Sequence, residues 1–207
     1  MFDGRTAWPN NSAITGFNQP EFYDVQLQAA RQVITLLKND QNVLPLDLTT
    51  ITETNKLIIT GPTSNVLSSL NGGWSYTWAG NEAGIYPQNV TNKTIFESFR
   101  ARLGSSKIEY FNSSSFNQLY NIDALLNASQ SASYILVCLG EQSYTETPGN
   151  INQLTLDDAQ LELVEQIRSR TKVPIIVALA QGRPRLIRRI VDLSSAIIMM
   201  FLPGMEG

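Results

Sequence analysis

The sequence predicts an α/β protein, built as a three-layer α/β/α sandwich around a mainly parallel sheet. Two patterns lead to this fold class. Continuous apolar runs such as residues 134–139, without alternating polar positions, are typical of parallel strands that are buried on both faces. Segments with apolar residues every three or four positions separate these runs, as amphipathic helices do. With 207 residues, 43% of them hydrophobic, the chain is long enough to bury one large core.

The first part of the chain predicts a linker, a helix and a strand. Residues 1–20 contain Pro9, Gly16 and several Asn and Ser residues, a composition typical of linkers. A helix is expected from Pro20 to Lys38, where apolar residues recur at alternating four- and three-residue spacing: Tyr23, Leu27, Ala30, Ile34 and Leu37. The apolar run 57–59 predicts a strand that ends at Gly61-Pro62.

Helices and strands are expected to alternate through the rest of the chain. The expected helices cover residues 95–103, 122–128, 157–170 and 184–191, and the expected strands cover residues 107–111, 134–139, 173–179 and 196–202. Gly104 ends the first of these helices, acidic residues open the third, and Pro203-Gly204 ends the last strand.

The composition excludes several classes of function. The net charge of −3 and the isoelectric point near 5.0 disfavour a nucleic-acid partner, which needs a surplus of Lys and Arg on one face. The basic run of Arg183, Arg185, Arg188 and Arg189 has helical spacing and is expected to form a solvated helix face. No apolar stretch approaches the roughly 18 residues that cross a bilayer, so no membrane partner is expected.

The residues that could carry chemistry are limited. Histidine is absent, which excludes Ser-His-Asp triads, Cys-His nucleophiles and His-based zinc sites. Cys138 is the only cysteine and lies inside an apolar run, where a small buried hydrophobic side chain is expected. Neither a GxGxxG nor a Walker sequence occurs, so no cofactor is expected. Carboxylates, hydroxyls, aromatic rings, Arg and Lys remain.

The strongest candidate site is the loop from Gly140 to Asn150. It follows an apolar strand and carries Glu141, Tyr144 and Glu146, at the end of the strand where open α/β sheets bind ligands. A general acid needs a raised pKa, which desolvation by Tyr and Trp neighbours could provide. The alternative for either Glu is a structural role, in which it caps a turn or pairs with an Arg.

Other loops should lie at the same edge of the sheet. The segments after Ile59, Leu139, Leu179 and Leu202 should share a rim because right-handed crossovers bring them together. The first leads to the Gly-rich segment 71–80, whose Trp74, Tyr76 and Trp78 could stack on a sugar ring or could simply plug the sheet edge. The segment 181–184 has Pro184 where a helix would begin, and it could equally form a capped turn.

Several motifs together resemble one enzyme family. In chain order they are Arg31 to Asn39 with Leu44-Pro45-Leu46, Gly61-Pro62, Gly72-Gly73-Trp74 with Trp78-Ala79-Gly80, the Gly140 to Asn150 loop, Leu154 to Leu156 with Gln160, Gly182-Arg183-Pro184, and Leu202 to Gly207. Their order and spacing, over roughly residues 25 to 207, resemble the second domain of glycoside hydrolase family 3. The members include β-glucosidases and exo-glucanases that remove terminal sugars with retention of configuration.

The resemblance implies a role for each candidate residue. A (β/α)8 barrel would carry the nucleophilic Asp, and this domain would supply the general acid/base, in a retaining mechanism that needs no metal. Glu146 matches the acid/base position and Trp78 matches the aromatic residue that stacks on the sugar, with Trp74, Tyr144 and Glu141 as further substrate-binding candidates. The expected substrate is a β-linked glucoside or oligosaccharide, and a secreted or periplasmic location is expected. Glu141, which is close to the strand end, is also expected to shape the loop.

The sequence departs from the family pattern at three points. No nucleophile segment of the barrel occurs, so the chain alone is expected to be inactive. Residues 1–20 would lead from a missing barrel domain, and residues 21–207 would form a C-terminally truncated, incomplete sandwich. Asn150 stands where an Asp is common. The alternatives are a sandwich that binds carbohydrate without catalysis and a module that only packs against a barrel. A surface around Trp74, Tyr76 and Trp78 would then need a partner.

Overall fold

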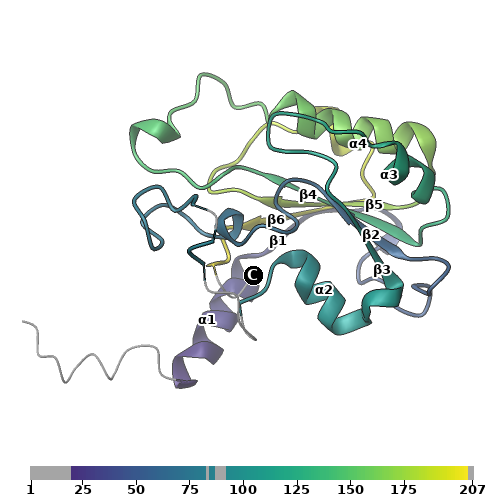
Figure 1. Cartoon of the computed structure of the whole chain (residues 1–207), viewed down its shortest axis with the longest axis horizontal. Coiled ribbons are helices and arrows are strands. Elements are labelled where there is room, and N and C mark those ends of the chain that lie inside the picture. Colours follow the sequence, from purple (N-terminus) through teal and green to yellow (C-terminus); the bar gives the residue numbers. More distant parts are fainter. Residues whose placement is uncertain (1–19, 83, 87–91, 205–207) are drawn as a thin grey trace, which may run out of the picture.

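The computed structural model describes residues 20–82, 84–86 and 92–204, and their six strands form one sheet in the order β1-β6-β5-β4-β2-β3 (Figure 1). The strands are β1 Thr35–Asn39, β2 Leu57–Thr60, β3 Ile108–Phe111, β4 Tyr134–Gly140, β5 Ile175–Ala180 and β6 Ala196–Phe201. The helices are α1 Pro20–Val33, α2 Ile95–Leu103, α3 Asp123–Ala128, α4 Asp158–Arg170 and α5 Arg188–Val191.

Helices cover both faces of the sheet, which confirms the three-layer sandwich. Helices α3 and α4 lie on one face, and α1 and α2 lie on the other (Figure 1). Side chains of a strand alternate between faces, so β4 sends Ile135 and Val137 toward α4, and Leu136 and Cys138 toward the opposite core. Central strands are therefore apolar at every position, as the sequence pattern indicated.

The strand order contains a change of direction that positions the site. Strand β2 pairs in parallel with β3 on one side and with β4 on the other, and β5 and β6 then follow β4 in parallel. The chain therefore moves outward from β2 to β3 and returns to the other side for β4. In open α/β sheets, ligands bind outside the carboxyl ends of the strands at such a switch point. Here that point lies between β2 and β4.

The expected helix over residues 20–38 was wrong in its last five residues. Helix α1 ends at Val33, and residues 35–39 form the edge strand β1, antiparallel to β6. Backbone pairing with β6 outweighs the helical periodicity here. The ammonium group of Lys38 reinforces this position because it donates hydrogen bonds to the carbonyl oxygens of Val191 and Ser194 at 2.6 and 2.7 Å, at the end of α5.

The expected helix over residues 184–191 was also too long. Only residues 188–191 are helical, because the preceding residues take an extended path beside residues 154–156. The Leu186 amide donates to the Leu154 carbonyl at 2.8 Å, and the Leu156 amide donates to the Leu186 carbonyl at 3.1 Å. The other expected elements are confirmed to within two residues of their bounds.

Some expectations fall outside the described residues. These are residues 1–19 of the linker expected over residues 1–20, whose last residue begins α1, and the last part of the family motif, residues 205–207. Within the part of the chain that the structure describes, no helix has both the length and the apolar character needed to cross a bilayer.

Cys138 offers a test of the core. Its side chain is fully buried between β4 and the α2 layer, and this burial raises the pKa of its thiol. We expect the folded chain to resist a thiol reagent at neutral pH and to react rapidly in denaturant, because only unfolding makes a reactive thiolate available. The measurement is the labelling rate as a function of denaturant concentration. Fast labelling without denaturant would contradict the buried position.

Candidate functional site

Four loops meet at the carboxyl edge of the sheet, as the right-handed connections predict. The loops after β2 and β4 are joined by a hydrogen bond at 2.9 Å from the Ser143 hydroxyl to the Ala79 carbonyl oxygen. The loop after β5 begins beside the end of β6, where the Gln181 amide donates to the Phe201 carbonyl oxygen at 3.1 Å. Leu202, the first residue after β6, lies close to both Gly72 and Gly182, because a Cβ atom on either glycine would be 3.3 Å from its Cδ1 atom. The predicted rim is therefore confirmed, and it surrounds the switch point between β2 and β4.

The loop that carries the two Glu residues begins from a fixed point. Gly140 has φ of 152°, and a Cβ atom there would collide with the Ala180 carbonyl group of the neighbouring strand. The buried amide of Gln160 binds both backbone groups of Gly140: its Oε1 accepts from the amide at 2.9 Å, and its Nε2 donates to the carbonyl at 3.0 Å. Helix α4 therefore fixes where the loop leaves the sheet.

Glu146 lies in the outer part of this loop, in an unusual backbone conformation. Its φ and ψ are 44° and −134°, in a region that glycine adopts readily and other residues rarely do. Its carbonyl oxygen accepts the Gly149 amide at 2.9 Å and so closes the short turn of residues 147–149. The Glu146 side chain is exposed. The expected desolvation by Tyr and Trp is therefore not provided by the described residues of this chain.

The aromatic segment presents three exposed rings. Trp74, Tyr76 and Trp78 are 67%, 64% and 49% exposed, and the first two have φ of 60° and 64°. Tyr86 packs against this segment. Its buried hydroxyl group donates a hydrogen bond to the Gly80 carbonyl oxygen at 2.5 Å, and its ring meets the Tyr76 ring edge to face at a centroid distance of 5.3 Å. The exposed rings form the surface around Trp74, Tyr76 and Trp78 that the sequence predicted.

The aromatic segment and the loop with Glu146 pack closely together. A Cβ atom on Gly73 would collide with the Cγ2 atom of Thr145 and lie 2.6 Å from the Tyr144 carbonyl oxygen. Glycine is therefore required where the segment passes the residues immediately before Glu146. The packing places Trp74 and Glu146 on adjoining segments, each one residue from this contact. Strained backbone at Trp74, Tyr76 and Glu146 is typical of functional sites.

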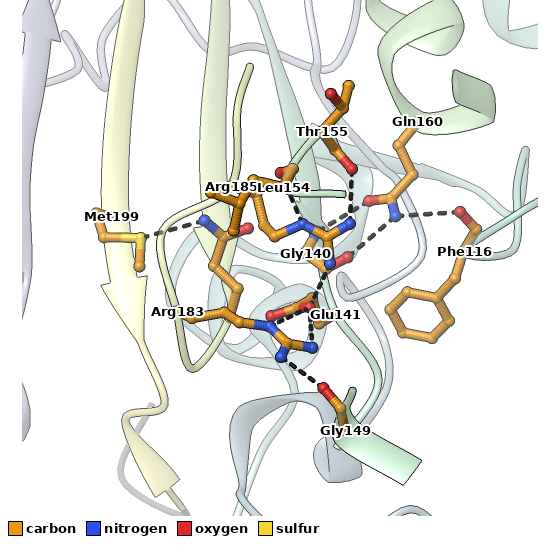
Figure 2. Close-up of polar contacts among 11 residues, drawn as sticks. Phe116, Gly140, Glu141, Gly149, Leu154, Thr155, Gln160, Arg183, Arg185 and Met199 are labelled. Atoms are coloured by element: carbon orange, nitrogen blue, oxygen red, sulfur yellow. Dashed lines mark hydrogen bonds and ion pairs between the residues drawn. The ribbon is translucent and has the colours of Figure 1, made fainter. Parts of the chain in front are cut away.

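Glu141 is a buried ion-pair partner, as the structural alternative proposed for it. Its side chain is 8% exposed, and its Oε1 atom lies 2.9 Å from Arg183 Nη2 and also pairs with Arg185 Nη1 (Figure 2). The expected solvated face of Arg183 and Arg185 was wrong, because these residues lie on the extended segment before α5 and turn inward. Of the same basic run, Arg189 does pair on the surface, with Glu165 and Asp158.

Tyr144 lies beside the ion pairs of Glu141 and contacts Arg183. Its ring lies 4.2 Å from the guanidinium carbon of Arg183, at cation–π distance. Burial and, after it, the charge of Glu141 raise the pKa of the Tyr144 hydroxyl, whereas Arg183 and Arg185 lower it. The hydroxyl is therefore a neutral hydrogen-bonding group at the pH of ordinary assays.

The residues that hold the loops in place were mostly missed from the sequence. Gln160 had a usable signal, since it lies on the apolar stripe of α4 with Val164 and Ile167, where a buried polar side chain needs partners. The sequence did not indicate the inward pairing of Arg183 and Arg185, because their partner Glu141 lies over 40 residues earlier. Tyr86 has its partners Gly80 and Tyr76 nearby in the sequence, but no pattern marked it as a support of the segment. Among residues 20–82, 84–86 and 92–204, no three His, Cys, Asp or Glu side chains are grouped to hold a metal ion.

Comparison with known proteins gives a consistent family. Residues 34–207 match the glycosyl hydrolase family 3 C-terminal domain. The chain is 30% identical over 210 residues to a lysosomal β-glucosidase of Dictyostelium discoideum, covering 96% of this chain and 24% of that protein. It is also 30% identical over 191 residues to a β-xylosidase of Formosa agariphila, covering 90% of this chain and 25% of the relative. The chain thus spans about a quarter of the length of these relatives.

Solved structures share the fold. A mutant β-glucosidase from Listeria innocua in complex with laminaribiose matches with a TM-score of 0.75 and 21% identity, over 97% of this chain and 25% of that one. An exo-1,3/1,4-β-glucanase from a Pseudoalteromonas species matches with a TM-score of 0.74 and 22% identity, over 97% of this chain and 23% of that one. These similarities support the sandwich architecture.

Proposed function

Because this chain belongs to the glycosyl hydrolase family 3 C-terminal domain family, we propose that it is the second domain of a retaining β-glucosidase that removes terminal β-D-glucosyl residues. One observation carries the proposal: Glu146 lies on a loop packed against a segment of exposed Trp and Tyr rings, at the switch point of the sheet. A carboxyl group beside flat aromatic faces is suited to a sugar with a scissile bond.

In this proposal Glu146 is the general acid/base. As the acid it protonates the glycosidic oxygen while the C1–O bond breaks and a nucleophilic Asp of a barrel domain forms an ester with C1. As the carboxylate it then removes a proton from water, which attacks C1 and releases the sugar and the Asp. The two carboxyl groups of a retaining enzyme lie about 5 to 5.5 Å apart, so the barrel must reach the exposed face of Glu146.

The aromatic side chains have complementary roles. Trp78 stacks on the sugar next to the scissile bond, Trp74 extends that surface, and Tyr144 offers a neutral hydroxyl group within the acid/base loop. Exposed Trp rings bind the axial C–H face of a pyranose, whose hydroxyl groups then remain free for hydrogen bonds. The substrate-binding role of Glu141 has less support, because the residue is buried and paired with two Arg side chains.

The exposure of the site supports a two-domain enzyme. Glu146 and the three rings are open to solvent in this chain, although a general acid is tuned by burial and a sugar site excludes water. A barrel domain that covers this edge would supply both the burial and the nucleophile. The chain alone is then a domain without hydrolase activity.

The first test joins the two domains. We expect hydrolysis of an aryl β-glucoside by this chain assembled with the barrel domain, and none by either domain alone, because each carries one of the two carboxyl groups. Proton NMR should show β-glucose as the first product, which marks retention. An aryl β-xyloside assayed in parallel decides between the activities named for the relatives. Activity of the barrel alone at the assembled rate would contradict the proposal.

A further inference from the structure

One guanidinium group touches the acid/base loop at three places. Arg183 Nε donates to Glu141 Oε1 at 3.0 Å at the start of the loop, and Arg183 Nη1 donates to the Gly149 carbonyl oxygen at 2.6 Å near its end. Between them the same group lies over the ring of Tyr144 at 4.2 Å. Figure 2 shows Arg183 between Glu141 and Gly149. The contacts lie on both sides of Glu146 in the sequence.

Arg185 has a different set of partners. Beyond its pair with Glu141, its Nε and Nη2 donate to the carbonyl oxygens of Leu154 and Thr155 at 2.9 and 2.6 Å, after the loop has ended. Its side chain is 9% exposed, whereas that of Arg183 is 26% exposed. Arg185 thus anchors Glu141 to the body of the domain, and Arg183 holds the loop to Glu141.

We infer that Arg183 is a positioning residue for the acid/base Glu146, an inference that rests on the proposed function. The planar guanidinium fixes the distance between residues 141 and 149, and this span determines where the exposed turn presents the Glu146 carboxyl group. The backbone strain at Glu146 needs such external support, since a rare conformation persists only when its surroundings enforce it. A carboxyl group displaced by about 1 Å can lose roughly 10²-fold in rate.

Removing Arg183 should leave the domain folded. Glu141 keeps its pair with Arg185, so the substitution leaves no buried carboxylate without a cation. The effect should therefore fall on catalysis. It should also fall on one step, because protonation of the leaving group depends on where the Glu146 carboxyl group lies, whereas a good leaving group departs without that proton.

The experiment compares leaving groups in the assembled enzyme. For Arg183→Ala we expect kcat/KM to fall about 10²-fold on an alkyl β-glucoside and less than about fivefold on a dinitrophenyl β-glucoside. Arg183→Lys should recover only part of the loss, because an ammonium group cannot make the planar, forked and stacked contacts together. Added guanidinium ion should restore part of the rate of Arg183→Ala. Arg189→Ala, which breaks the surface ion pairs with Asp158 and Glu165 outside the loop, is the control and should behave as wild type.

Three outcomes overturn the inference: equal losses on both substrates, no loss on either, or a full recovery in Arg183→Lys. Glu146→Gly, assayed in parallel, separates this inference from the proposed function. If Glu146→Gly loses activity while Arg183→Ala does not, only the positioning role fails. If Glu146→Gly keeps its activity, the acid/base assignment itself fails. Thermal unfolding of each variant shows whether the domain is folded, and Arg183→Lys decides the matter if Arg183→Ala is not.

Discussion

Replacing Glu146 with Gly should lower turnover of an aryl β-glucoside by the assembled enzyme by about 10² to 10⁴-fold, the range of general acid/base catalysis. With an activated leaving group the first step needs no proton, so the loss should appear in hydrolysis of the glycosyl-enzyme ester. Azide is a small anion that needs no base, and it should restore turnover and yield a β-glucosyl azide. The measurements are the steady-state rate with and without azide and the identity of the product.

The same substitution should not destabilise the domain. Glu146 has φ of 44° and ψ of −134°, and glycine adopts this conformation at little cost. Its side chain is exposed, so its removal leaves no cavity. We therefore expect an unchanged or raised Tm, which means that lost activity can be attributed to the carboxyl group. Gln142→Gly, at another exposed position of the loop, is the matched control.

Near-normal turnover of Glu146→Gly would contradict the assignment of Glu146 as the acid/base. The domain would then remain as a carbohydrate-binding or packing element, since Glu141, the other carboxyl group of the loop, is buried and paired with two Arg side chains. Quenching of Trp fluorescence by added sugar distinguishes a carbohydrate-binding element from a packing element, since a bound sugar would contact the exposed rings of Trp74 and Trp78.

The strands and helices around the central sheet could be predicted because their signals are local. The run from Tyr134 to Leu139 is apolar at every position, and a buried parallel strand is the structure that such a run favours. Residues 35–39 could not be assigned in this way. Their spacing fits a helix, and only the pairing with β6, more than 150 residues away, makes them a strand. Pairing with a distant strand can therefore override the local conformational preference of a segment.

The candidate site shows the same division. Positions at the carboxyl edge could be predicted, since topology alone brings the loops after β2 and β4 together. The contacts within the edge could not. Arg183 and Arg185 have the spacing of a helix face, but the carboxylate of Glu141 lies over 40 positions earlier and draws both inward. The sequence around Arg183 and Arg185 does not indicate that the buried carboxylate of Glu141, on another loop, needs a cationic partner.

The close contact between the two loops leads to the second large effect. Gly73→Ala should lower kcat/KM of the assembled enzyme on an alkyl β-glucoside by about 10²-fold, because the added methyl group collides with Thr145 Cγ2 and approaches the Tyr144 carbonyl oxygen. The aromatic segment and the acid/base loop must then separate, which moves Trp78 and Glu146 apart. Steady-state kinetics and Tm are the measurements.

Gly72→Ala is the matched control for this effect. Neither glycine has φ in the left-handed region, and a Cβ atom on Gly72 would meet only the Leu202 Cδ1 atom, at 3.3 Å, near the tip of a flexible side chain. Gly72→Ala should therefore retain kcat/KM within about threefold of wild type. The two variants add the same methyl group one residue apart, so a difference between them reports the contact with the acid/base loop and not the flexibility of glycine.

A second substitution can identify the contact itself. Thr145→Ser removes the Cγ2 atom that the new methyl group meets, so in the Gly73→Ala background it should restore part of the lost activity, although it brings no gain to wild type. Such non-additivity is expected only of residues in direct contact. Two outcomes would contradict this prediction: equal activity of Gly73→Ala and Gly72→Ala, or the same effect of Thr145→Ser in wild type and in Gly73→Ala. Either one would mean that the spacing of the two loops does not control the position of Glu146. In the proposed enzyme, the Glu146 carboxyl group would then have to be positioned by the barrel domain.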